Sequence, residues 1–199
     1  MKDLGYYNGQ IGPLDEMQVP MNNRACYFGD GVYDATFSQN HVPFALDEHI
    51  DRFYNSAALM RMDVPMGKAA LRALLLELVK KVDAHEQFVY FQLSRGCAQR
   101  LHAFSGGPAS LWVMLTPHAV NPRAFRFKLI TVPDTRFFHC NAKTLNLLPN
   151  VLAKQRAVES GCDEAVFHRA DRVTECSHNN VHIIKDGVLR TAPTDELIL

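Results

Sequence analysis

His139-Cys-Asn-Ala-Lys143-Thr-Leu-Asn-Leu-Leu-Pro-Asn150 carries one formal charge, on Lys143, among small, apolar and amide side chains. Burial in such surroundings lowers the pKa of an ammonium group, because desolvation disfavours its charged form. A lysine of this kind can be neutral near pH 7 and attack a carbonyl to form a Schiff base. The alternative is a lysine at a strand end, with its aliphatic stem packed and its amino group in water. The stretch alone favours this alternative, since most lysines are of that kind.

A second stretch with a single formal charge changes that balance: Val173-Thr-Glu175-Cys-Ser-His-Asn-Asn-Val-His-Ile-Ile184. Its charge is on Glu175, which lies among hydroxyl, thiol and amide groups. A lone carboxylate there either accepts a local backbone hydrogen bond or faces a cationic partner. One such partner is the protonated ring nitrogen of a pyridoxal cofactor, which a carboxylate holds so that the ring can act as an electron sink. The two stretches together therefore favour a reactive lysine.

The composition is that of an ordinary globular protein, with 199 residues of which 47% are hydrophobic and 21% charged. Lysine plus arginine equals aspartate plus glutamate, 21 against 21, so nucleic acids and acidic membranes are poor candidate partners. The N-terminus has no apolar segment of signal-peptide length. No later run approaches the ~20 apolar residues of a membrane span. We therefore expect neither a nucleic acid nor a membrane as partner.

The cysteines are odd in number, widely scattered and without a Cys-x-x-Cys pair: Cys26, Cys97, Cys140, Cys162 and Cys176. This pattern argues against both a disulfide framework and a zinc ribbon. We expect free thiols in a reducing cytosol. No grouping of histidines and cysteines has ligand spacing, so no metal site is expected.

Residues 4 to 45 are expected to form short strands joined by turns. Tyr7-Asn8-Gly9-Gln10 is typical of a type I′ hairpin. Phe28-Gly-Asp-Gly-Val-Tyr33 supplies glycines for a sharp turn, followed by a strand to about Ser38. A further short strand should end near Ala45.

Two amphipathic helices should follow and cover the sheet, from about Asp47 to Met62 and from about Gly67 to Val82. Apolar residues at helical spacing define the face that each should bury. These are Ile50, Phe53, Tyr54, Ala57 and Ala58 in the first helix and Leu71, Leu74, Leu75, Leu78, Val79 and Val82 in the second.

Two strands are then predicted. Gln87–Ser94 alternates and is rich in β-forming residues, and Leu111–Thr116 is an apolar run typical of a buried strand. The segment between them, Arg95–His102, is too polar and too long for a plain hairpin. Two prolines in residues 117–122 break the pattern, so an interdomain linker is expected there. The predicted domains are therefore residues 1–116 and 123–199.

The second predicted domain begins with a strand over residues 125–132 and continues through the Lys143 stretch. A helix should start near Pro149, since proline is tolerated at the first helical position. It should end at Ser160-Gly161, where glycine suits a left-handed conformation. The remaining strands are predicted over residues 164–168, 181–185 and 188–191.

Six motifs stand in order along the chain: Tyr27-Phe-Gly-Asp-Gly-Val-Tyr33, Glu48-His-Ile-Asp-Arg52-Phe-Tyr, Tyr90-Phe-Gln-Leu-Ser-Arg-Gly96, Arg100-Leu-His102, Lys143-Thr-Leu-Asn-Leu-Leu148 and Val173-Thr-Glu175. In order and interval they resemble the fold-type IV pyridoxal-phosphate aminotransferases, and most of all the D-amino-acid (D-alanine) type. Six motifs in register are a specific signal, whereas the Gly29 and Gly31 pair alone would be weak. The resemblance implies an α/β (α+β) fold of two domains: a small N-terminal sheet with helices and a C-terminal pseudo-barrel that binds the cofactor.

The resemblance implies roles for three residues around pyridoxal 5′-phosphate. Lys143 would bind the cofactor covalently and then move the α-proton of the substrate. Glu175 would keep the pyridine nitrogen protonated. Arg52 would anchor the phosphate through forked hydrogen bonds. The alternative for Arg52 is an ion pair with Glu48, one turn earlier on the same helix surface.

A trap for the substrate carboxylate is also implied, formed by Tyr33, Arg100 and His102. Arginine suits this purpose because its two parallel donors fix the orientation of a planar carboxylate. In the family, the arginine and histidine come from the other subunit, so a homodimer is implied. Tyr90 matches a family position near the active site. The alternatives are a solvated loop for Arg100 and His102 and a buried strand tyrosine for Tyr90.

The pair Arg100-Leu-His102 favours the D-amino-acid type over branched-chain aminotransferases and aminodeoxychorismate lyase. The expected reaction is transfer of an amino group from a D-amino acid such as D-alanine to a 2-oxo acid such as 2-oxoglutarate. One alternative is that the chain is one of these two other enzymes, which act on L-branched-chain substrates or eliminate pyruvate. The other is that the chain is not an enzyme and dimerises or binds the cofactor without turnover.

The chain departs from the family pattern in two places. Cys176-Ser-His178-Asn179-Asn180 stands where the family carries a run of serines near the cofactor, so His178 and Asn179 bear on substrate preference. The sequence stops at Leu199, a residue assigned to the cofactor site. In the family a Gly-Ile-Thr turn that holds the phosphate follows this point. We expect a C-terminally truncated aminotransferase whose last apolar residues are uncovered.

Overall fold

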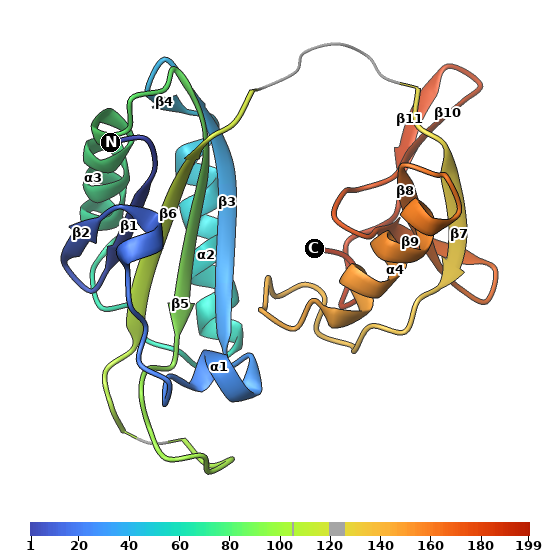
Figure 1. The fold of residues 1–199 in the computed structure, drawn as a ribbon. Coiled ribbons are helices and arrows are strands. Elements are labelled where there is room, and N and C mark those ends of the chain that lie inside the picture. The colour runs from blue at the N-terminus through green and yellow to red at the C-terminus, as the bar shows by residue number, and fades with distance from the viewer. Residues whose placement is uncertain (105, 120–125) are drawn as a thin grey trace. The chain divides into compact units, whose positions relative to one another are not determined.

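The computed structural model describes residues 1–104, 106–119 and 126–199, and the chain divides into two compact units (Figure 1). The first unit comprises Met1–Pro122 and Ala142–Leu145, and the second comprises Arg123–Asn141 and Asn146–Leu199. The segment around Lys143 therefore belongs to the first unit, whereas the sequence analysis placed it in the second. Residues 120–122 of the expected linker, and the expected strand start at residue 125, lie outside the described residues.

The first unit contains a six-stranded antiparallel sheet in the order β2-β1-β6-β5-β3-β4. The predicted hairpin is confirmed, with Asn8 and Gly9 at φ values of 47° and 97° between the first two strands. The predicted strands of this region are confirmed within one to three residues at their ends. The strands are β1 (Leu4–Tyr7), β2 (Gln10–Gly12), β3 (Gly31–Gln39), β4 (Val42–Pro43), β5 (Glu86–Ser94) and β6 (Ser110–Pro117).

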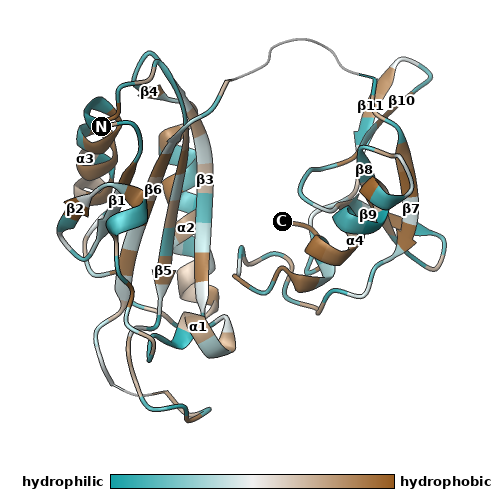
Figure 2. Cartoon of the chain, viewed as in Figure 1, coloured by the Kyte–Doolittle hydropathy of each residue, from teal (hydrophilic) through white to brown (hydrophobic). Residues whose placement is uncertain are grey.

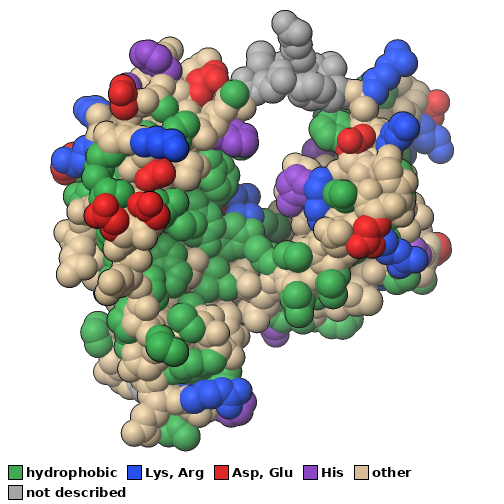
Figure 3. Space-filling model, viewed as in Figure 1, with side chains coloured by type: hydrophobic (Ala, Val, Ile, Leu, Met, Phe, Trp, Pro, Cys, Tyr) green, Lys and Arg blue, Asp and Glu red, His purple; other side chains and the backbone are tan. Residues whose placement is uncertain are grey.

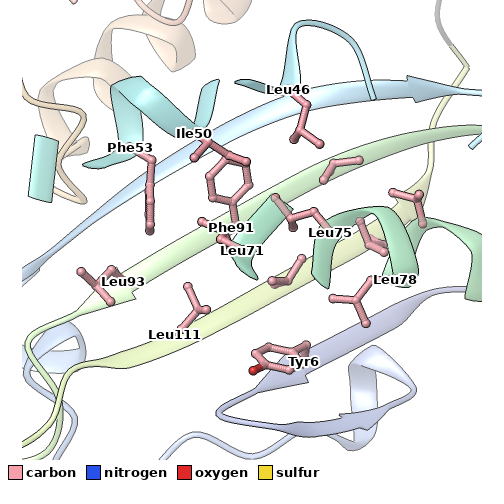
Figure 4. Close-up of a cluster of buried hydrophobic side chains, with 14 of the residues drawn as sticks. Tyr6, Leu46, Ile50, Phe53, Leu71, Leu75, Leu78, Phe91, Leu93 and Leu111 are labelled. Carbon is pink, nitrogen blue, oxygen red and sulfur yellow. The ribbon is translucent and has the colours of Figure 1, made fainter. Parts of the chain in front are cut away.

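Two helices cover one face of this sheet, α2 (Leu46–Leu59) and α3 (Lys68–Leu78), the latter extended by a 3-10 turn, η2 (Val79–Lys81) (Figures 1 and 4). Figure 4 shows their apolar side chains directed at those of β5 and β6, and Figure 2 shows the hydrophobic residues along these strands. The predicted buried face of α2 is wrong at Ala58, which is exposed, whereas Ser56 is buried. Apolar spacing does not reveal Ser56, a polar residue whose Oγ accepts a hydrogen bond from the Lys143 N–H at 3.0 Å.

A short helix, α1 (Arg24–Phe28), precedes β3 and was not predicted, because five residues are too few to show a helical period. Asn23 caps it by accepting a hydrogen bond from the Ala25 N–H at 3.0 Å. Gly29 ends it in the left-handed conformation, at φ 60°. A 3-10 turn, η1 (Leu14–Glu16), lies earlier in the chain.

The second unit contains a three-stranded sheet in the order β7-β8-β9 and a two-stranded sheet, β10-β11. The first two strands are parallel and are joined through α4, and the third is antiparallel to β8. Gly161, at φ 67°, ends α4 as predicted. The strand β9 was not predicted. The elements are β7 (Leu129–Pro133), α4 (Leu148–Glu159), β8 (Glu164–Arg169), β9 (Arg172–Cys176), β10 (His182–Lys185) and β11 (Val188–Thr191).

The C-terminal residues were expected to be uncovered, and this expectation is wrong. Leu197 and Ile198 are 8% and 5% exposed. The segment is tied to the rest of the second unit by its backbone: the Leu197 carbonyl accepts from Arg136 at 3.2 Å, and the Leu197 N–H donates to Asp195 at 2.9 Å. In the described part of the chain, no helix is both long and apolar enough to span a membrane.

Candidate active site

The backbone around Lys143 is fixed against β3 and α2 in the first unit. Its carbonyl accepts a hydrogen bond from the Tyr33 N–H at 2.9 Å, and its own N–H donates to Ser56 Oγ at 3.0 Å. Two residues on, the Leu145 N–H donates to the Gly31 carbonyl at 3.0 Å. Gly31 is required there, because a Cβ at this position would lie 2.6 Å from the Leu145 side chain. The Lys143 backbone is therefore hydrogen-bonded through both its N–H and its carbonyl.

The amino group of Lys143 lies 4.6 Å from the centre of the Tyr33 ring. Tyr33 stacks on Tyr90, with ring centres 5.3 Å apart, and the Tyr90 hydroxyl donates to Gln92 Oε1 at 2.6 Å. Burial, and then the nearby Tyr33 phenol, raise the pKa of Tyr90 above its ordinary value. The structure thus brings together three predicted site residues, Lys143, Tyr33 and Tyr90.

These residues occupy the sheet face opposite the helices. Along β3 the buried residues Val32 and Asp34 alternate with Tyr33 and Ala35, so the two sets point to opposite faces. The helices pack on the first set. Figure 3 shows hydrophobic side chains gathered over the first unit's strands on the side turned to the viewer. Lys143 therefore lies on a face of the sheet that carries two stacked tyrosine rings.

Arg52 on α2 pairs with Asp34 rather than with Glu48, so the predicted alternative for this residue is wrong. Its Nε and Nη2 each donate to one oxygen of the Asp34 carboxylate at 2.8 Å. His49 Nδ1 lies 2.8 Å from the same carboxylate. Burial would raise the pKa of Asp34, but the hydrogen bonds from Arg52 and His49 outweigh it, and the pKa lies below its ordinary value. The guanidinium side chain stays 37% exposed.

Sequence reasoning missed Asp34, although a signal for it exists. A carboxylate at an inward position of an alternating strand needs a cationic partner, because an unpaired buried charge is costly. Asp34 is 0% exposed. Arg52 and His49, three residues apart on the helix above it, are the candidates that the sequence offers.

Arg100 and His102 lie close to one another in the loop between β5 and β6. The Arg100 guanidinium carbon is 5.0 Å from the centre of the Phe28 ring, and the His102 ring centre is 5.0 Å from the same point. Both side chains are exposed. The loop begins at Gly96, which has a φ of 92°. Glycine is needed there because a Cβ would collide with the Pro108 carbonyl. The two predicted carboxylate-binding residues therefore share one aromatic ring.

In the second unit, Glu175 on β9 is buried, with a side-chain exposure of 9%. Arg136 Nη1 donates to its Oε1. The Leu199 N–H donates to its Oε2 at 3.4 Å. Glu175 and Leu199, both predicted to bind the cofactor, are therefore neighbours.

Arg136 is the central cation of this region, and sequence reasoning missed it. Besides Glu175 it binds Asp134, through Nε at 3.0 Å and Nη2 at 2.9 Å. Burial would raise the pKa of Asp134, but its hydrogen bonds from Arg136 lower it to about 2. Burial would lower the pKa of Arg136, but its hydrogen bonds to the two carboxylates raise it above the ordinary value. The available signal was Asp134-Thr-Arg136, two opposite charges directly after β7.

The residues that depart from the family pattern are held by Glu164 on β8. Its carboxylate accepts hydrogen bonds from Ser177 Oγ and, at 3.0 Å, from Asn179 Nδ2. His178 Nδ1 lies 2.6 Å from the same carboxylate. Burial would raise the pKa of Glu164, but hydrogen bonds from Ser177 and the backbone lower it. Asn150 at the start of α4 donates to the Ser177 carbonyl at 2.7 Å. This segment is therefore ordered by a buried carboxylate.

Comparison with known proteins identifies the family of this chain. The family model described as Amino-transferase class IV matches residues 31–199. A protein named D-alanine aminotransferase from Listeria innocua serovar 6a is 40% identical over 198 residues, which cover 96% of this chain and 68% of the relative. This chain belongs to the class IV aminotransferases. A D-alanine aminotransferase from Bacillus licheniformis is 36% identical over 206 residues, covering 97% of this chain and 69% of the relative.

Solved structures give the same family. The fold IV-transaminase from Curtobacterium pusillum has a TM-score of 0.82 and 25% identity, covering 95% of this chain and 68% of that one. A branched-chain amino acid aminotransferase from the organism abbreviated T.th. has a TM-score of 0.82 and 26% identity, covering 98% and 68%. The predicted fold class of this class IV aminotransferase is therefore confirmed.

Proposed function

We propose that this class IV aminotransferase transfers the amino group of D-amino acids, such as D-alanine, to 2-oxo acids, such as 2-oxoglutarate, with pyridoxal 5′-phosphate as cofactor. The observation that carries the proposal is the 40% identity to a protein named D-alanine aminotransferase over 96% of this chain. A solved branched-chain neighbour at 25% identity binds pyridoxamine 5′-phosphate, which supports the choice of cofactor.

The residues present fit this cofactor. Lys143 offers an amino group on the aromatic face of the first unit. Glu175 offers a buried carboxylate whose Oε2 accepts only a long bond, of 3.4 Å, among the described residues. That oxygen can accept a further hydrogen bond, such as one from a pyridine N–H. Bound pyridoxal phosphate supplies an electron sink for the substrate α-carbon.

Lys143 is the residue we assign to binding the cofactor and to carrying the α-proton. Its backbone N–H and carbonyl are both hydrogen-bonded, which would keep the residue in place while the amino group turns about its side-chain bonds. Glu175, oriented by Arg136, would accept the ring N–H. Arg52, oriented by both Asp34 oxygens, would present its exposed edge to the phosphate.

Arg100 and His102 would bind the substrate carboxylate with Tyr33, and Tyr90 would support Tyr33 by stacking. We further propose a homodimer in which the loop of one subunit serves the other, as the resemblance implies. A reducing cytoplasm is the proposed location, supported by five cysteines that are all free thiols.

Absorption spectroscopy of the purified chain with added pyridoxal phosphate tests the proposal. When the amino donor is added without a 2-oxo acid, D-alanine is expected to change the cofactor absorption, and L-alanine is expected to leave it unchanged. A change with L-alanine alone, or no change with either enantiomer, would overturn the D-amino-acid assignment.

A second candidate is supported by the branched-chain neighbour at 26% identity. L-leucine and L-valine are therefore included as further amino donors in the same experiment. A response to these two donors and not to D-alanine would favour branched-chain transamination.

A further inference from the structure

Arg24 on α1 holds the backbone of the loop that carries Arg100 and His102. The Arg24 side chain is 3% exposed. Its Nη1 donates to the Leu101 carbonyl at 2.6 Å and to the Ala103 carbonyl at 3.4 Å, and its Nη2 donates to the His102 carbonyl at 3.4 Å. One buried guanidinium thus binds three consecutive carbonyls, in the segment that begins directly after Arg100.

Asp30 fixes the orientation of this guanidinium. Its Oδ2 accepts a hydrogen bond from Arg24 Nε at 2.7 Å, which leaves Nη1 and Nη2 of the guanidinium to donate to the loop carbonyls. Arg95 also donates its Nε to Asp30, at 3.0 Å. The Arg95 amino groups point elsewhere, to the carbonyls of Met60 and Arg61, each at 2.8 Å. The two arginines therefore share a carboxylate, but only Arg24 donates hydrogen bonds to the loop carbonyls, whereas Arg95 contacts the loop through the Phe104 ring, 3.7 Å from its guanidinium carbon.

The Phe28 ring links Arg24 to the two loop side chains. The Arg24 guanidinium carbon is 4.9 Å from the ring centre, and the Arg100 guanidinium carbon and the His102 ring centre are each 5.0 Å from it. Arg24 and Phe28 are one helical turn apart, so α1 presents both to the loop. The Arg24 N–H also donates to the Gly96 carbonyl at 2.8 Å.

We propose that Arg24 is a positioning residue for the substrate carboxylate: together with Asp30 and Phe28, it fixes Arg100 and His102 in one arrangement. This inference rests on the proposed function, since it assumes that Arg100 and His102 bind that carboxylate. A bidentate site needs its donors held within about half an ångström, and exposed side chains on an untethered loop do not meet that need. Lysine cannot replace Arg24, because it lacks the planar fork that reaches the aspartate and the carbonyls together.

Steady-state and half-reaction kinetics of cofactor-loaded Arg24→Lys test the inference. We expect KM for D-alanine, and the inhibition constant of propionate as a simple carboxylate, to rise together by about tenfold, with kcat changed much less. Arg95→Met is the matched control, because it also removes a donor from Asp30 but leaves the three loop carbonyls bound. It should change both constants less than Arg24→Lys does. Equal effects of the two variants on KM, kcat and cofactor absorption would show a general structural role and overturn the inference.

Tryptic cleavage after Arg100, followed by mass spectrometry, gives a readout that does not depend on activity. We expect cleavage at this bond to be several-fold faster in Arg24→Lys than in the wild-type chain or Arg95→Met, because the released loop enters the protease more readily. Faster cleavage with no D-alanine reaction in the wild type would refute the proposed function and leave the tether in place. A wild-type reaction with D-alanine, but with cleavage and KM unchanged in Arg24→Lys, would overturn the tether itself.

Discussion

Lys143 in the first unit and Glu175 in the second are held by different means. In the first, the described residues form a core of nineteen buried hydrophobic side chains, and Lys143 lies on the far face of the sheet that this core supports. In the second, the described core has five such residues, of which three are alanines. There the buried carboxylates of Asp134 and Glu175 converge on Arg136.

Apolar packing and a buried ion cluster respond differently to mutation and to pH. Apolar burial stabilises through area removed from water and does not change with protonation. A buried ion cluster depends on every member being present, because removing one leaves uncompensated charge in a poorly solvated place. We therefore expect the surroundings of Glu175 to respond strongly to charge changes and acid, and those of Lys143 to respond to core volume.

The largest effect is expected for Arg136→Met. Glu175 would lose the cation it pairs with, and Asp134 would keep only Arg169 Nε at 3.3 Å, which should lower the free energy of unfolding by about 3–5 kcal/mol. Urea denaturation measures it without adding salt. Arg156→Met, on the exposed side of α4, is the control and should stay within about 0.5 kcal/mol of the wild type. An Arg136→Met chain as stable as the control would show that the second unit does not depend on its ion cluster.

Leu75→Ala tests the core of the first unit. Leu75 is 0% exposed, and its truncation should cost about 2–5 kcal/mol through lost burial and a cavity. Amide hydrogen exchange should lose protection in β5 and keep it in β8. Leu59→Ala, at a residue 45% exposed on α2, is the control with little expected change. Equal loss of protection in both strands would show that the two units unfold together.

Acid should weaken the second unit through Asp134. Its pKa in the folded chain is lowered from 3.8 to about 2, so its contribution is present above the ordinary pKa. That contribution is lost as the pH falls from about 4 towards 2. Urea titrations across this range should show the free energy of unfolding falling, with a shallower fall in Asp134→Asn. Asp171→Asn, at an exposed position, should keep the wild-type slope.

The smallest effect is expected for Tyr33→Phe. The ring stack on Tyr90 would remain while one hydroxyl is removed, so KM for D-alanine should rise about fivefold, or about 1 kcal/mol, with unchanged stability. Tyr54→Phe is the control, since that hydroxyl bonds only to the Met66 carbonyl among the hydrogen bonds of the described residues. A large fall in stability for Tyr33→Phe would contradict a role in substrate binding alone.

The sequence predicted those elements whose signal is local. The helices α2, α3 and α4 and the two hairpins follow from helical period, glycine positions and turn residues. The short α1 gave no period, and β9 was hidden because its polar residues Thr174 and Glu175 are buried. Neither element was predicted, because each is stabilised by contacts with residues distant in the sequence.

The site residues divide in the same way. Lys143 and Glu175 stand out as isolated charges, and the family motifs mark Arg100 and His102. The partners of these residues are distant in sequence: Arg136 and Glu175 are 39 residues apart, and Arg24 binds the carbonyl of Leu101, 77 residues away. Such pairs form only when the fold brings distant strands and loops together. The spacing of apolar residues along the sequence does not predict which distant segments meet.

The assignment of Lys143 as the reactive lysine can be tested directly. Borohydride reduction of the chain mixed with pyridoxal phosphate, followed by tryptic mass spectrometry, measures which lysine carries the cofactor. We predict one added cofactor mass on the peptide that contains Lys143, and loss of that label in Lys143→Ala. Label spread over exposed lysines such as Lys68, with Lys143 unmodified, would contradict the assignment.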